Sequence, residues 1–141
     1  VFLCGFYADM DADFQKILSI LPESTKMVIF PAHNENENAP YNSLSLHPEV
    51  GLADWKGFLD QLIIDGVEEY MLCYNDEYGH SKQLAGFAGA CLIYSYLYQK
   101  PATFHQRLGY ILYPSETQDN IENNLKELEF ISESAYNFSY N

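Results

Sequence analysis

Acidic side chains follow three apolar runs of this 141-residue chain. The runs cover residues 1–8, 27–30 and 69–74. If each run is a strand of one parallel sheet, the loops behind their carboxyl ends converge at a single edge. The residues expected to gather there are Asp9, Asp11, Asp13, Glu35, Glu37, Asp76 and Glu77, with Tyr41, Tyr74 and Tyr78 nearby.

Such an edge has the chemistry to hold a divalent cation. Carboxylate oxygens suit Mg²⁺ or Mn²⁺, and imidazole nitrogens such as those of His33 and His80 suit Zn²⁺. No HxxxH or HxH spacing fixes a ligand set, however, and acidic loop residues are more often simply solvated. We therefore predict no metal and no cofactor.

The segment Asp9-Met10-Asp11-Ala12-Asp13 after an apolar run resembles the start of the haloacid dehalogenase family. The resemblance implies a nucleophilic first Asp, a second Asp acting as acid or base, and bound Mg²⁺. It covers only this segment and the run before it, and the later Lys and paired-acid motif of that family have no counterpart here. The favoured interpretation is that Asp11 or Asp13 caps the helix that carries Phe14.

A second motif, Gly79-His80-Ser81-Lys82-Gln83, resembles the G-x-S-x-G nucleophile elbow. Gln83 replaces the final glycine of that turn, and no acidic residue lies between Ser81 and His105, the only later histidine. We therefore interpret Ser81 as the N-cap of the helix that follows.

Periodicity of apolar residues gives the order of elements. Alternation of strands and helices at this spacing predicts an α/β fold, a layered single domain over residues 1–141 with a mostly parallel sheet and flanking helices; the alternative is an α+β mixed sheet. Expected strands cover 1–8, 27–30, 69–74 and 109–113, expected helices 14–21, 55–66, 81–98 and 115–128, a loop 33–48, and an edge strand or frayed tail 131–141.

Charge limits the class of partner. Twenty Asp and Glu against seven Lys and Arg give a formal net charge of −13, while 48% of the residues are hydrophobic, so a folded domain with an acidic surface is expected. Direct contact with nucleic acid or with an anionic membrane is excluded, because both need clustered cations. A basic protein is the expected partner.

Cysteine usage indicates a reducing compartment. The chain has an odd number of cysteines, Cys4, Cys73 and Cys91, with no CxxC spacing, and all three lie in apolar runs. We therefore predict buried free thiols and a cytoplasmic location. The apolar stretch 84–98 is too short to span a membrane. A start at Val1 rather than Met leads us to expect residues upstream of it.

Together these features predict an acidic protein-binding inhibitor that neutralises a basic partner, such as an immunity protein for a nuclease toxin or an anti-defence protein. Carboxylates would cover the partner's basic surface and tyrosines would anchor it. The alternative is a small metal-dependent hydrolase or phosphotransferase that uses the same acidic loops. A subunit or fragment of a larger assembly is a third possibility.

Overall fold

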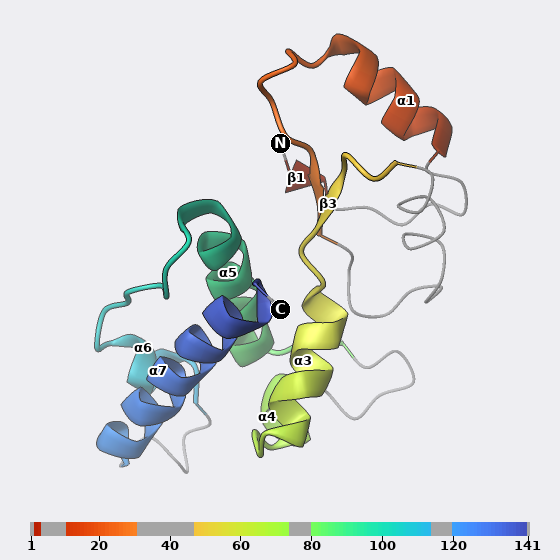
Figure 1. Cartoon of the computed structure of the whole chain (residues 1–141). Coiled ribbons are helices and arrows are strands. Elements are labelled where there is room, and N and C mark those ends of the chain that lie inside the picture. The colour runs from red at the N-terminus through yellow and green to blue at the C-terminus, as the bar shows by residue number, and fades with distance from the viewer. Residues whose placement is uncertain (1, 4–10, 31–46, 74–79, 114–119, 141) are drawn as a thin grey trace. The chain divides into compact units, whose positions relative to one another are not determined.

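The computed structural model describes residues 2–3, 11–30, 47–73, 80–113 and 120–140 (Figure 1). The chain divides into two compact units, Val1–Lys56 and Gly57–Asn141. Of the described residues, 60% are helical and 6% lie in strands. Each unit is described by itself below.

The first unit contains a small parallel sheet and one helix. The strands β1 (Phe2–Leu3), β2 (Val28–Ile29) and β3 (Gly51–Leu52) lie in the order β1-β2-β3, and both neighbouring pairs are parallel. Helix α1 (Asp11–Ile20) connects the first two strands. A small core joins the elements, with buried Met27, Ile29 and Val50 in contact with Ile17, Leu18, Leu21 and Leu52.

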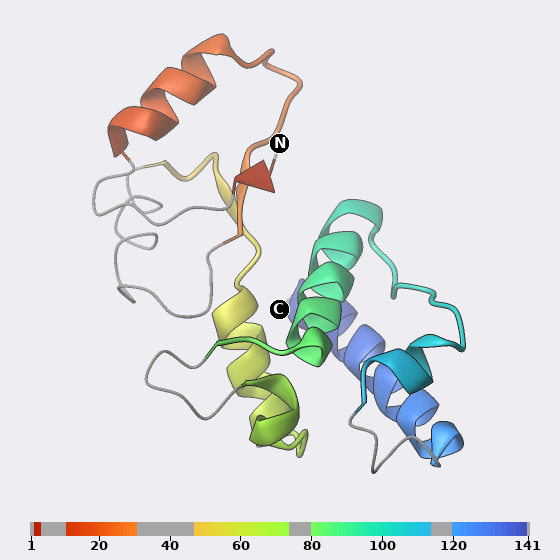
Figure 2. The ribbon, with the colours of Figure 1, turned by 180° about the vertical axis from the view of Figure 1, so that it is seen from behind.

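The regular elements described in the second unit are all helices (Figure 2). Its elements are α3 (Trp55–Ile64), whose first two residues precede the boundary between the units, α4 (Glu69–Leu72), α5 (Gln83–Tyr98), α6 (Leu108–Ile111) and α7 (Ile121–Phe138).

Helices α5 and α7 build the core of this unit (Figures 1 and 2). Helix α5 is apolar on nearly all sides and ends at Gln99, which takes the left-handed conformation with a φ of 54°. Phe58 of α3 packs against Phe138, with ring centroids 5.4 Å apart. The fully buried residues of the two helices include Leu84, Ala88 and Leu92 of α5 and Leu128, Ile131 and Ala135 of α7.

Buried polar groups fix α7 to the chain before it. The Asn124 amide Nδ2 donates to the Gly109 carbonyl at 2.9 Å, and the Tyr113 hydroxyl donates to the Asn124 carbonyl at 3.1 Å. Further along the helix, the Ser132 hydroxyl donates to the Ala102 carbonyl at 2.8 Å. Satisfied buried groups of this kind set the rotation of α7 about its axis, since any other rotation leaves them without partners.

The predicted layered α/β fold is wrong, because three segments that were expected to be strands or a tail form helices instead. Residues 69–72 form α4, residues 108–111 form α6, and the predicted edge strand 131–141 continues α7 as far as Phe138. Short apolar runs do not distinguish a strand from a buried helical turn. In the tail, buried Ser132 and Ala135 continue the inward stripe of α7, but neither is apolar enough to mark it in the sequence.

Other expectations are confirmed. The first two strands are parallel neighbours, and the helices expected at 55–66 and 81–98 are α3 and α5. Strand β3 was not predicted, and the N-cap of α5 is Lys82 rather than Ser81. The start of the helix expected at 115–128 lies outside the described residues, and the single-domain assignment stays a prediction.

Candidate protein-binding surface

Only two of the predicted surface residues fall in the described part of the chain. Asp11 and Asp13 lie in the first turn of α1, where the helix dipole favours negative charge. The helix begins at Asp11, so neither residue takes the capping position that was predicted for one of them. The other eight, Asp9, Glu35, Glu37, Tyr41, Tyr74, Asp76, Glu77 and Tyr78, lie outside the described residues.

One of the three strands that were expected to bring these acidic residues together, at residues 69–74, is not a strand. Asp76 and Glu77 were expected to follow a strand, but the segment before them ends in α4. Their segment runs between Cys73 and Ser81, which pair as an isolated antiparallel bridge. Convergence with the loops of the first unit therefore has no support from a shared sheet.

A different acidic surface is present on α7. Residues at a spacing of three and four along this helix alternate between a buried stripe and an exposed one. We call the exposed stripe the α7 face. Its members are Glu122, Lys126, Glu129, Phe130, Glu133, Tyr136, Asn137 and Tyr140, the last lying just beyond the helix end.

The charges of the α7 face are unevenly balanced. Lys126 Nζ forms an ion pair with Glu122 Oε1 at 2.8 Å. A hydrogen bond and the charge of Lys126 lower the pKa of Glu122, and the same hydrogen bond and the charges of Glu122 and Glu129 raise the pKa of Lys126. Glu129 and Glu133 form no ion pair with any described residue. The C-terminal two-thirds of the face is therefore negative.

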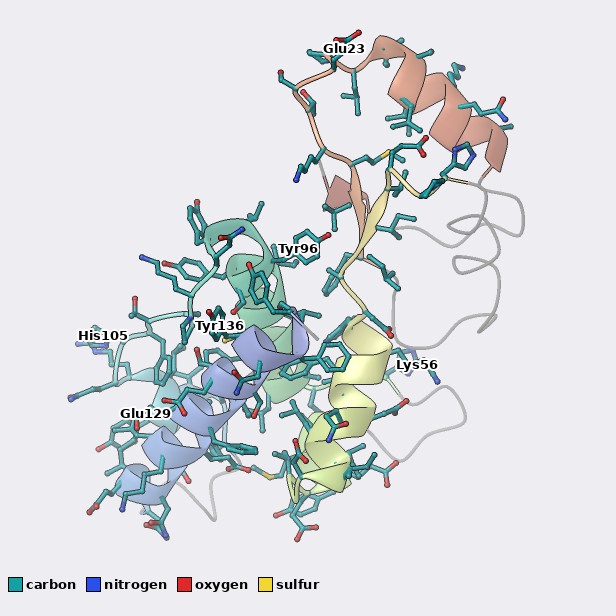
Figure 3. The ribbon with its side chains drawn as sticks, viewed as in Figure 1. Glu23, Lys56, Tyr96, His105, Glu129 and Tyr136 are labelled. Carbon is teal, nitrogen blue, oxygen red and sulfur yellow. The ribbon has the colours of Figure 1, made fainter. Side chains whose placement is uncertain are left out.

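Aromatic residues share the α7 face with these carboxylates, and Figure 3 labels Glu129 and Tyr136 of this helix. The Phe130 side chain is 40% exposed and that of Tyr140 is 50% exposed, while Tyr136 is partly buried between them. Phe130 and Tyr136 lie three residues before and three after Glu133, so each is its neighbour on the helix surface. Carboxylates and aromatic rings thus occupy the same stripe.

Tyr140 is held in place by contacts on both helices. Its hydroxyl donates to the Ser95 carbonyl of α5 at 3.1 Å, and its ring centroid lies 5.2 Å from that of Tyr136. Desolvation, and repulsion by the ionised side chains of Tyr136 and Tyr96, raise the pKa of Tyr140. We call Tyr96, Tyr136 and Tyr140 the tyrosine cluster.

The remaining tyrosines of α5 point elsewhere. Tyr94 and Tyr98, four residues apart on α5, pair with ring centroids 4.6 Å apart, and the Lys100 ammonium lies 5.9 Å from the Tyr94 centroid. Tyr98 is exposed.

The α7 face can be recognised in the sequence by the spacing of its residues. Acidic and aromatic residues recur at helical spacing from Glu122 to Tyr140, which is the pattern of a solvated helix surface. Treating the tail as a strand hid it, because a period of two places Phe130, Ser132 and Ser134 together instead.

The described thiols agree with the sequence. Cys73 and Cys91 are buried and form no disulfide, while Cys4 lies outside the described residues. Burial raises the pKa of Cys91 to about 11, opposed by a hydrogen bond with Ser132. His47 is also buried, with Nδ1 lying 3.4 Å from Glu49 Oε1.

Within the described ranges, no three His, Cys, Asp or Glu side chains are grouped closely enough to hold a metal ion. None of the helices seen there has the length and apolarity needed to cross a bilayer. Comparison with protein families, with curated proteins and with solved structures found no match.

Proposed function

We propose that this protein is an acidic protein-binding inhibitor that neutralises a basic partner, and that the α7 face is part of the surface it uses. The α7 face supports the proposal because it combines partly exposed rings with two carboxylates, Glu129 and Glu133, that pair with no cation in the described part of the chain. Interfaces are commonly anchored by aromatic side chains, and complementary charge accelerates association.

The distribution of charge also supports a basic partner. Of the net −13, residues 57–141 carry −8, from twelve acidic and four basic residues. Helix α7 adds its own field, since it has no basic residue in its last turn and the C-terminal end of a helix dipole is negative. A cationic surface of a nuclease toxin or a similar basic protein would meet an attractive potential there.

The contribution of the α7 face to partner affinity is tested with two variants that lose the same number of charges. The partner is first isolated by affinity capture at low salt, identified and purified. Its affinity is then measured for the wild type, for Glu129→Gln/Glu133→Gln, and for the control Glu68→Gln/Glu69→Gln. Both variants remove two exposed carboxylates from the second unit, but only the first changes the α7 face.

We expect the α7 variant to bind about tenfold more weakly and the control to lose less than about threefold, with affinity falling steeply as salt rises. Stoichiometric addition of the wild type should also inhibit the partner's activity. Equal losses in both variants would show that net charge, rather than this surface, drives binding. Recovery of no basic partner, together with metal-dependent hydrolysis by the purified protein, would overturn the proposal.

A further inference from the structure

We infer that the tyrosine cluster makes the α7 face selective for arginine side chains over lysine side chains in its partner. This inference rests on the proposed function and names the chemical group that the surface recognises. The preference for arginine follows from how the rings are held and from what lies beside them. Lysine–tyrosine contacts elsewhere in the same unit show only that tyrosine rings here can meet a cation.

The ring of Tyr140 is a fixed and accessible platform. Its hydroxyl is held by the Ser95 carbonyl and one side of the ring meets Tyr136, yet half of the side chain remains exposed. A ring fixed in this way loses little conformational entropy when a planar group stacks on it. Tyr136 extends the platform along the helix.

Negative groups lie within one turn of the platform. Glu133 precedes Tyr136 by three residues on the same face, and the last carbonyls of α7 lie at the negative end of the helix dipole. A guanidinium group is planar, so it can stack on a ring while its N–H groups reach a carboxylate or a carbonyl. A lysine ammonium is a strongly hydrated point charge and gains much less from stacking.

Cations already contact tyrosine rings within this unit. The Lys82 ammonium lies 5.8 Å from the centroid of Tyr70, and the Lys100 ammonium lies 5.9 Å from that of Tyr94. Both distances fall in the range of cation–π attraction. Tyr136 and Tyr140 have no such cation among the described residues, so their rings are available to one from a partner.

The test uses two peptides of equal length and charge, nona-arginine and nona-lysine, titrated into the full-length protein by calorimetry. We expect nona-arginine to bind the wild type about fivefold more tightly than nona-lysine. Tyr136→Leu/Tyr140→Leu should reduce that ratio to about one, mainly by weakening nona-arginine binding. Tyr110→Leu is the matched control, since Tyr110 is 50% exposed like Tyr140 but lies on α6, and it should keep the ratio.

Two further measurements separate the possible failures. Tyr140→Phe keeps the ring and removes only its hydrogen bond, so it should retain most of the ratio even if the double variant folds poorly. In the wild type, nona-arginine should shift the ring-proton resonances of Tyr136 and Tyr140. Binding of both peptides with equal affinity, or unshifted rings, would overturn the arginine preference alone. No binding of either peptide would overturn the arginine preference and count against the α7 face as well.

Discussion

Helices α5 and α7 lie against each other in one unit and have nearly the same length, but they expose opposite chemistry. Helix α5 contains no charged residue over its 16 positions, and its exposed positions include Gly86, Ala90 and Leu97. Helix α7 contains four glutamates and one lysine, all outside its buried stripe. Both helices supply the core, but only α7 presents a charged surface.

The difference in charge between α5 and α7 distinguishes residues that stabilise the fold from residues that are available to bind a partner. Residues that face the shared core have little freedom to change, because interiors are packed as densely as organic crystals. On the α7 face, Glu129 and Glu133 are exposed and form no ion pair with any described residue, so packing constrains them less than it constrains the core positions. A functional surface is therefore better sought on α7 than on α5.

The largest expected effects test whether the two helices share one core. Leu92→Ala in α5 and Leu128→Ala in α7 should each lower the free energy of unfolding by about 2–5 kcal/mol, because both side chains are fully buried. Urea unfolding monitored by circular dichroism measures this. Glu129→Gln, next to Leu128 on the outside of α7, is the control and should change stability by less than about 0.5 kcal/mol. A loss below about 1 kcal/mol for Leu128→Ala would mean that α7 does not pack as described.

A smaller effect is expected from the buried thiol that α5 directs toward α7. In the folded state the pKa of Cys91 is about 11, against an ordinary value of 9.0, so folding favours the neutral thiol. The stabilisation is complete below pH 9 and is lost as pH rises toward 11, since the unfolded chain ionises first. The difference corresponds to about 2–3 kcal/mol.

Cys91→Ala separates this effect from other groups that titrate at high pH. Burial, together with the charge of Glu127 and a hydrogen bond to it, also raises the pKa of Tyr113, so the wild type alone does not isolate the thiol. We expect unfolding in urea at pH 8 and pH 10.5 to show a steeper loss for the wild type than for Cys91→Ala. Parallel losses in the two proteins would contradict burial of Cys91 between the helices.

The same comparison shows which features the sequence predicts well. The long apolar period of α5 predicts its place and its burial, and the alternation around residues 1–30 predicts two parallel strands. The face of α7 was missed because its inner stripe includes Asn124, Ser132 and Ala135, whose burial depends on hydrogen bonds and close packing with segments distant in sequence. The periodicity of apolar residues alone does not reveal buried polar or small residues of this kind.

Site prediction failed for a related reason. Convergence of the acidic loops was inferred from a parallel sheet, so it depended on residues 69–74 being a strand. Buried Val67, Met71 and Leu72 instead follow the spacing of a helical turn. The net charge, which needs no fold to interpret, still favours a basic partner.

The smallest expected effect concerns the exposed side of α5. Gly86 lies within the helix, and a Cβ added there meets no atom within 4 Å. Alanine restricts the unfolded chain and favours helix, so Gly86→Ala should raise the free energy of unfolding by about 0.5–1 kcal/mol. Gly89→Ala is the matched control, since Gly89 is buried and added volume there should lower stability. Thermal and urea unfolding of the two variants distinguish the positions. If Gly86→Ala is also destabilising, the exposed side of α5 is packed against another part of the protein, and the contrast between the two helices narrows to charge alone.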